Sequence, residues 1–291
     1  ERAAGEAPGL GEAAGVTHHV PHGQVPDAAA ALIDAIGSDR LVALGGGRVI
    51  DVAKAIAAVR GGEVAAVPTT LSGAEMTAIH RLPPGASATG IRPALVLADP
   101  DLMTSAPEPQ LRATAMNALA HGADCLYTPL ATERTRLDAL RGAGLIATSL
   151  DQSPAERDTA SLALGALMTA GALDVAGLSL HHVISQTVVR VCGTPHAETN
   201  AAVLAVVMEE MAGRAPDQIA ALAAELGTDP AGIRARIEEL AGGRRGLGEL
   251  GAARECIERA VEAAMHRGEL ETMTPGEVTA ADIRRLIEAA W

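Results

Sequence analysis

The chain has 291 residues and a formal net charge of −13, with one Tyr, one Trp and no Phe. This length suits two ordinary domains, whose cores must be built from aliphatic side chains and Met. The scattered arginines and the lack of aromatic platforms argue against a nucleic-acid partner. No charged and apolar leader opens the chain, and no apolar run reaches the roughly 18 residues of a membrane helix, so we expect a soluble, cytoplasmic protein.

The first part of the chain has the pattern of a βαβ unit. Strand-like apolar runs at 41–44, 64–67 and 94–97 alternate with a helical pattern at 50–59. Strands connected through helices run parallel, so we expect a parallel sheet with a Rossmann-like α/β arrangement.

After Asp99-Pro100 the strand-like runs stop, and the remainder predicts an all-helical domain. The expected helices include 110–126, 155–175, 197–211, 216–226 and 252–266. We therefore predict a nucleotide-binding α/β domain over residues 1–103 and a helical substrate domain over 104–291. The glycine- and arginine-rich segment 242–248 has the composition of a mobile loop between helices.

Three cysteines, Cys125, Cys192 and Cys256, are far apart and form no CxxC motif. Their odd number and spacing are typical of reduced thiols in a cytosolic protein. We expect all three to be small core residues.

A glycine loop follows the first strand. Gly45, Gly46 and Gly47 lead directly into a helix, which would bring backbone N–H groups and a helix N-terminus to one point. Such a point suits a phosphate, although many α/β proteins use a glycine turn only to reverse direction. Asp51 and Lys54 lie three residues apart on that helix, and Lys54 is the only lysine in the chain, which favours a functional ammonium over a solvated one.

A second loop follows the next strand, at the carboxyl end where open α/β sheets bind ligands. Its hydroxyl groups, those of Thr69, Thr70 and Ser72, could donate to a phosphate or ribose. The alternative is a turn in which these hydroxyls bind their own backbone.

The helical half contains histidines in a spaced pattern. Asn117 and His121 lie four residues apart and share one helix face, and His182 and His196 come from later helices. A single histidine is more often structural, but three from separate helices could converge. An amide is a poor metal ligand, so Asn117 argues against a metal.

These segments together resemble the iron-containing alcohol dehydrogenase superfamily, and its maleylacetate reductase branch in particular. The resemblance lies in Gly45-Gly-Gly-Arg-Val-Ile-Asp-Val-Ala-Lys54, Pro68-Thr-Thr-Leu-Ser-Gly-Ala-Glu-Met-Thr77, Met116-Asn-Ala-Leu-Ala-His121, Leu180-His-His182 and Pro195-His-Ala-Glu-Thr199. They occur in the family's order and at its spacing.

The resemblance implies a dehydroquinate synthase-like fold and a nicotinamide cofactor, NAD or NADP, in a homodimer. It implies that Gly45 to Gly47 hold the pyrophosphate and that Asp51 with Lys54 flank the ribose and phosphates. It implies that Thr69 and Thr70 line the nucleotide. The four metal positions of the alcohol dehydrogenases fall on Asn117, His121, His182 and His196; because the reductase branch commonly has Asn at the first, a metal is expected to be unnecessary.

Several features depart from that family, among them Gln186, Ala74, Arg48 and the front of the chain. Gln186 stands where a histidine usually lies beside the reacting centre; an amide can orient a carbonyl or carboxylate but cannot shuttle protons near neutral pH. The strand-helix-strand unit that usually precedes the segment at His19 has little room, so the chain looks shortened at its front.

We therefore predict that the chain is an NAD(P)H-dependent reductase of a small oxo-acid or enone. The candidate catalytic residues are Asn117, His121, His182, Gln186 and His196. The alternative is a fold reused for non-redox chemistry, a lyase, isomerase or cyclase that keeps the histidine pocket. A third hypothesis is a catalytically inactive partner subunit.

Overall fold

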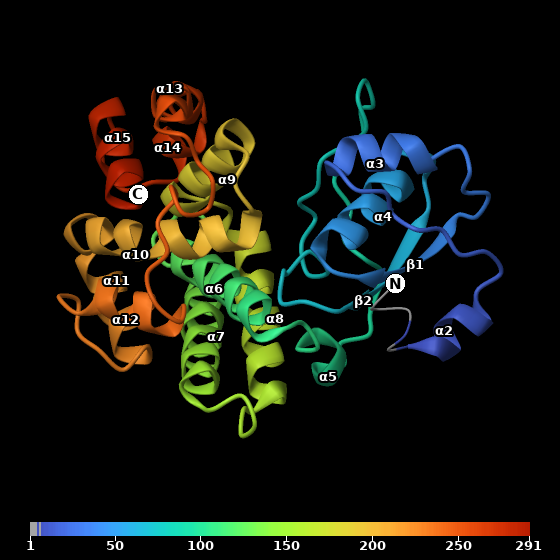
Figure 1. The fold of residues 1–291 in the computed structure, drawn as a ribbon, viewed down its shortest axis with the longest axis horizontal. Coiled ribbons are helices and arrows are strands. Elements are labelled where there is room, and N and C mark those ends of the chain that lie inside the picture. The colour runs from blue at the N-terminus through green and yellow to red at the C-terminus, as the bar shows by residue number, and fades with distance from the viewer. Residues whose placement is uncertain (1–4, 6) are drawn as a thin grey trace. The chain divides into compact units, whose positions relative to one another are not determined.

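The computed structural model describes residue 5 and residues 7–291 (Figure 1). The chain divides into two compact units, residues 1–106 and residues 107–291. The sequence predicted this division at residue 103.

The first unit contains a three-stranded parallel sheet, as predicted. Strands β1 (Arg40–Gly45), β2 (Glu63–Pro68) and β3 (Leu95–Val96) lie in the order β1-β2-β3. The helix α4 (Gly47–Arg60) connects β1 to β2. Its buried residues divide between two hydrophobic clusters, so α4 packs on both the sheet and its neighbouring helix α3 (Val25–Leu32). Two short helices, α2 (Pro8–Ala13) and α5 (Pro100–Met103), complete the unit.

The second unit is helical throughout, as expected. Its helices are α6 (Glu108–Cys125), α7 (Glu133–Asp151), α8 (Thr159–Ala176), α9 (Leu180–Cys192), α10 (His196–Arg214), α11 (Pro216–Glu225), α12 (Ile233–Leu240), α13 (Ile257–Met265), α14 (Glu269–Thr272) and α15 (Ala280–Ala289), with the 3-10 turn η1 (Arg254–Cys256). Every residue of α6 from Ala113 onward is buried. This helix therefore forms the centre of the unit, packed against α7, α8 and α10 (Figure 1).

The helices α7 and α8 approach closely because glycines meet at their contact. A Cβ on Gly165 would lie 2.7 Å from the carbonyl oxygen of Gly142, and a Cβ on Gly142 would lie 2.8 Å from that of Gly165. Either alanine substitution would force the two backbones apart.

One helix among the described residues, α8, is long and apolar enough to cross a membrane, with a mean hydropathy of 1.4. This helix differs from the expectation that no apolar run is long enough for a membrane helix. Half of this window is buried inside the protein, and α8 packs against α6 and α7. Core helices of soluble proteins have the same length and composition, and this packing is that of a core helix.

A disulfide bond joins Cys192 at the end of α9 to Cys256 in η1. The prediction of three reduced thiols is therefore wrong for this pair; Cys125 alone is free, and it is buried in α6. The two partners are 64 residues apart, and the helix packing that brings them together leaves no local signal in the sequence.

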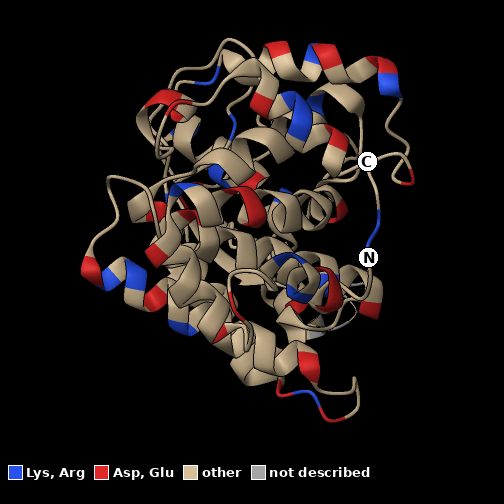
Figure 2. Ribbon diagram, turned by 90° about the vertical axis from the view of Figure 1, so that its left-hand side faces the viewer, with Lys and Arg blue, Asp and Glu red and all other residues tan. Residues whose placement is uncertain are grey.

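Charges of both signs are interspersed over the described chain (Figure 2). Several arginines of the helical unit are held by carboxylates, as in the pairs Arg234–Glu209, Arg236–Asp151 and Arg284–Glu258. Paired arginines of this kind do not form the concentrated positive surface that a phosphate backbone requires.

Candidate functional site

The glycine loop between β1 and α4 packs closely against neighbouring side chains. Gly45 has φ of +156°, and a Cβ there would lie 2.8 Å from Cγ2 of Val49. A Cβ on Gly46 would lie 3.1 Å from Cγ2 of Thr70, and one on Gly47 would lie 2.7 Å from Oγ of Ser72. The three glycines are therefore required by packing, and they place the N-terminus of α4 directly against the second loop.

The second loop lies where the sequence predicted it. The Thr69 N–H donates to the carbonyl of Gly45, which ties the two loops together at the carboxyl ends of β1 and β2. Thr70 is buried, and its Oγ1 has no hydrogen-bond partner among the described residues. A buried hydroxyl without a partner suits a ligand group, since leaving it unpaired has an energetic cost.

The Lys54 ammonium is fully buried and serves the protein itself. Its Nζ donates to the carbonyls of Ala74, Thr77 and Ile79 at 2.8, 3.0 and 2.9 Å, and it lies 2.8 Å from Oδ1 of Asp51. An ammonium has three donors, and all are used here. Lys54 therefore has no donor left for a phosphate in this arrangement; it fixes the loop that follows Ser72, and its influence on a nucleotide would be indirect.

Burial raises the pKa of Asp51, and the neighbouring Lys54 opposes this rise. The Arg48 side chain, which follows the glycines, donates to the carbonyl of Pro21. It is thereby engaged by the protein's own backbone.

Glu75 is a buried acid in the same loop that sequence reasoning did not select. It is 1% exposed, and neither carboxylate oxygen has a hydrogen-bond partner among the described residues. Burial raises its pKa to about 7, an effect that Lys54 only partly offsets. A carboxyl group in this state is a candidate for ligand binding, because perturbed acids concentrate at functional sites.

In the helical unit, the predicted histidines come together. The rings of His121 from α6 and His182 from α9 stack with centroids 5.1 Å apart. His181 meets His182 edge-on at 4.7 Å, and the pKa of His196 is lowered by burial and, to a smaller extent, by the neighbouring His182. We call the set His121, His181, His182 and His196 the histidine cluster.

Asp124 organises this cluster. Its Oδ2 lies 2.8 Å from Nδ1 of His182 and also accepts the backbone N–H groups of Ser179 and His182, at 3.0 and 3.2 Å. Its other oxygen accepts the hydroxyl of Tyr127. Burial by itself would raise the pKa of Asp124, but these donors and the nearby histidines lower it below its usual range. The carboxylate is thus ionised and fully bound.

The ionised Asp124 fixes the tautomer of His182. Because the carboxylate accepts from Nδ1, that nitrogen carries a proton, and the tautomer selected by this contact is the one in which Nε2 bears the lone pair. The Nε2 atom is buried and has no hydrogen-bond partner among the described residues. The arrangement presents one basic nitrogen, held in orientation by a buried carboxylate, which suits a ligand to a metal or a contact to a substrate.

The other rings are kept neutral and oriented by amides. Asn117 lies 3.2 Å from Nε2 of His121, and Asn200 lies 3.1 Å from Nε2 of His196. Burial lowers the pKa of His121 well below its usual range, aided by the neighbouring histidines. Burial also lowers the pKa of His181 to about 3 and that of His196 to about 4.

One group in the described chain has the composition of a metal site: the ligand atoms of Asp124, His181 and His182 all lie within 4.8 Å of one another. The expectation that a metal is unlikely therefore has no support from the structure. The chemistry of neutral, oriented imidazoles fits a divalent transition metal.

Gln186 lies one turn after His182 and is held by an arginine. Its Oε1 accepts from Nη1 and Nη2 of Arg267, at 3.3 Å each, and Arg267 is itself paired with Glu269 at 2.5 Å. Since a guanidinium can only donate, the amide oxygen must face Arg267. The amide –NH₂ is therefore directed away from Arg267, and Gln186 is a fixed donor.

Sequence comparison agrees with this geometry. Residues 9–104 match the family described as iron-containing alcohol dehydrogenase, and residues 112–291 match the C-terminal part of the same family. The chain belongs to the iron-containing alcohol dehydrogenase family. It is thus an oxidoreductase by family, and members use NAD(P) and often iron.

Within this family, the chain is similar to maleylacetate reductases over most of its length. Maleylacetate reductase 1 of Rhodococcus opacus is 31% identical, over 95% of this chain and 79% of the relative. Maleylacetate reductase 2 of Cupriavidus pinatubonensis is 33% identical, over 97% of this chain and 81% of the relative.

Solved structures show the same fold. The maleylacetate reductase from Agrobacterium tumefaciens has a TM-score of 0.86 and 25% identity, covering all of this chain and 87% of its own. An iron-containing alcohol dehydrogenase from Corynebacterium glutamicum has the same TM-score and 29% identity, covering all of this chain and 85% of its own. The predicted family and two-part fold are confirmed.

Sequence reasoning missed several residues of the site. Asp124 lies three residues after His121, so its position on the same helix face was the only available signal. The contribution of Arg267 had no signal, because its partner Gln186 is 81 residues away.

Proposed function

We propose that this protein is an NAD(P)H-dependent reductase of a small oxo-acid or enone, similar to the maleylacetate reductases. The observation that carries the proposal is the Asp124–His182 pair, which presents an unpartnered, buried Nε2 beside the stacked ring of His121. It is supported by the similarity of nearly the whole chain to maleylacetate reductases.

The nucleotide is proposed to bind at the two loops of the first unit. The N-terminus of α4 and the close backbone of Gly45 to Gly47 suit the pyrophosphate, because a helix N-terminus with unpaired N–H groups attracts anions. The hydroxyls of Thr69, Thr70 and Ser72 are offered to the phosphates or ribose. Asp51 is proposed to bind a ribose hydroxyl, with Lys54 holding its carboxylate in place.

A bound dinucleotide would supply a hydride to the electrophilic carbon of the substrate, and solvent water would supply the proton that completes the reduction. The residues of the second unit are proposed to bind and polarise that substrate. His121 and His196, whose pKa values burial lowers, donate a ring N–H to its carbonyl or carboxylate oxygen, and Asn117 keeps the His121 ring in one orientation. His182 offers the lone pair of Nε2 to a donor group of the substrate or to a metal. Gln186 donates its fixed –NH₂ to a substrate carboxylate or carbonyl, a role that requires no proton transfer.

A metal, where present, would be held by the imidazole nitrogens of His121, His182 and His196, and it would act as a Lewis acid on the substrate oxygen. Asn117 adds only a weak ligand. We infer that Asp124 orients His182 in this arrangement, because both of its oxygens are already bound by donors. Loss of activity on dialysis against a chelator, restored by Fe²⁺ or Zn²⁺, would assign the metal an essential role.

The enzyme is further proposed to be a cytoplasmic homodimer. Light scattering of the purified protein measures the assembly. Alkylation of thiols in intact cells, followed by mass spectrometry, measures whether Cys192 and Cys256 are paired in the compartment where the protein resides, since cytosolic thiols are usually kept reduced.

The proposal is tested by titrating the full chain into NADH and NADPH while following nicotinamide fluorescence. We expect saturable binding of at least one nucleotide and oxidation of that nucleotide when maleylacetate is added. Failure to bind either nucleotide would overturn the proposal. Gly46→Val, which places side-chain atoms against Thr70, is expected to abolish nucleotide binding while the far-ultraviolet circular dichroism is retained.

A further inference from the structure

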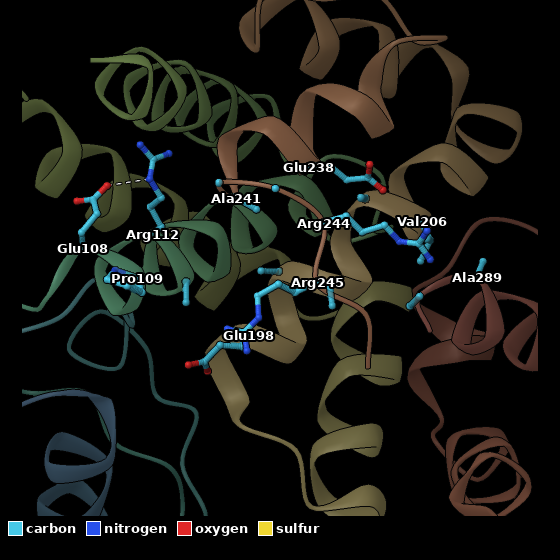
Figure 3. A pocket seen from close by; sticks show the side chains of 17 residues that line it. Glu108, Pro109, Arg112, Glu198, Val206, Glu238, Ala241, Arg244, Arg245 and Ala289 are labelled. Atoms are coloured by element: carbon cyan, nitrogen blue, oxygen red, sulfur yellow. Dashed lines mark hydrogen bonds and ion pairs between the residues drawn. The ribbon is translucent and has the colours of Figure 1, made fainter. Parts of the chain in front are cut away.

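A second concave site lies within the helical unit, away from the histidine cluster. It has a volume of about 300 Å³ and is lined by the first turns of α6, one face of α10, the end of α12 with the loop 241–245, and the end of α15 (Figure 3). All of its lining residues belong to residues 107–291, so the cavity is complete in one unit. Its size falls at the lower end of small-molecule sites.

The cavity is open because small side chains line it. Ala113, Ala201, Ala202 and Ala205 form much of the apolar surface, and each side chain ends at Cβ. The three alanines on α10, Ala201, Ala202 and Ala205, lie on the face opposite to His196 and Asn200, because the helix has 3.6 residues per turn. The cavity and the histidine cluster thus share a helix and no residue.

Most charges around the cavity are already neutralised by the protein. Glu108 receives Arg112 at 2.8 Å and Arg157 at 2.6 Å, and Arg112 also donates to the carbonyls of Leu240 and Leu150. Glu238 is paired with Arg234 at 3.3 Å. These groups are bound by partners within the protein, so a ligand would have to displace those contacts to use them.

Two further arginines line the cavity, and they differ from the paired groups described above. Within the described part of the chain, Arg244 and Arg245 make no hydrogen bond or ion pair, and Glu198 is the one lining carboxylate that is likewise unpaired. Figure 3 draws both arginines on the loop that crosses the cavity. The unpaired charges therefore sum to one positive charge, in a chain whose net charge is −13.

The loop that carries these arginines is anchored at both ends, in contrast to the expectation of a mobile segment. At its start the N–H groups of Gly242 and Gly243 donate to carbonyls of α12, and both glycines have positive φ. At its end Leu247 donates to the carbonyl of Ala290. The arginines are thus held beside the cavity, which lowers the ordering cost of binding.

We propose that this cavity binds a small organic carboxylate: the apolar surface takes the carbon skeleton, and a guanidinium of the loop, that of Arg244 or Arg245, binds the carboxylate. Guanidinium groups suit this role because they donate two parallel hydrogen bonds to a carboxylate. The inference goes beyond the proposed reductase reaction and does not depend on it.

The test is calorimetric titration of the full chain with benzoate, with its neutral isostere benzamide, and with inorganic phosphate. We expect benzoate to bind at one site per chain, and benzamide and phosphate to bind at least tenfold more weakly. The double variant Arg244→Ala/Arg245→Ala should weaken benzoate binding at least tenfold, whereas the exposed, matched Arg259→Ala should leave it unchanged.

Two further variants separate this cavity from the catalytic site and from unfolding. Ala202→Leu fills the cavity and is expected to abolish benzoate binding with both arginines in place. His182→Asn alters the histidine cluster and should leave benzoate binding intact. Equal binding of benzamide, unchanged binding by the double arginine variant, or loss of binding in His182→Asn would each overturn the proposal.

Discussion

The carboxylate of Asp124 lies 2.8 Å from Nδ1 of His182 and is bound at the same time by Tyr127 and by two backbone N–H groups. This buried pair sets which nitrogen of His182 faces outward as a base. The site therefore depends on a residue that need not touch the substrate.

Asp124→Asn is expected to lower kcat by about 10²- to 10⁴-fold, because an amide can donate to Nδ1 and reverse the tautomer of His182. Steady-state kinetics would show a smaller change in KM. The exposed Asp217→Asn is the matched control and should retain full activity. An Asp124→Asn enzyme with wild-type kcat would show that the tautomer of His182 is irrelevant.

Arg267→Met is expected to raise KM for the substrate about 10-fold or more, because the Gln186 amide is then free to rotate and loses its fixed donor. Nucleotide affinity, measured by fluorescence, should be unchanged. The variant Gln186→Glu tests the donor itself, because a carboxylate still pairs with Arg267 but offers no N–H to the substrate. Unchanged KM in both variants would contradict a role for Gln186 in substrate binding.

Lys54→Met is expected to destabilise the protein by about 3–5 kcal/mol, because it leaves the paired Asp51 and three carbonyls without their buried partner. Urea unfolding measures the loss, with the exposed Arg40→Met as control. As Lys54 is the only lysine, acetylation by an activated ester should leave it unmodified in the native protein and modify it in urea. Rapid acetylation of native Lys54 would contradict its burial.

Glu75→Gln is expected to stabilise the protein above pH 7. Burial raises the folded-state pKa of Glu75 from 4.5 to about 7, so between these values the folded state binds more protons than the unfolded state. The free energy of unfolding must therefore fall as pH rises through this window, by about 3 kcal/mol for a shift of this size. Denaturation at pH 4.5 and pH 8 should show a gain for Glu75→Gln only at pH 8; equal effects at both pH values would contradict the assignment.

The parts of the fold that could be predicted are those with local patterns. Apolar runs in the sequence predict the strands that begin at Arg40 and Glu63. The glycine loop is recognisable because it lies between a strand and a helix in one contiguous segment. His121, His182 and His196 were selected because the family motifs lie in register. Each of these signals is contained within a few residues of the chain.

The rest depends on contacts between distant segments. Asp124 meets His182 across 58 residues, and Gln186 meets Arg267 across 81. Lys54 looked available to a phosphate because a helical pattern does not reveal that the following loop folds back over its ammonium. The alanines of the second cavity are ordinary helix formers in sequence, and only the packing of four helices leaves a space above them.

The bond between Cys192 and Cys256 closes the polypeptide into a ring, and the loop bearing Arg244 and Arg245 lies on that ring. Trypsin cuts after arginine, so a single nick in this loop opens the ring without releasing a fragment. The nicked protein should migrate as one species on a non-reducing gel and as two after reduction. The chain can thus be severed beside the second cavity while α9 and η1 stay covalently joined.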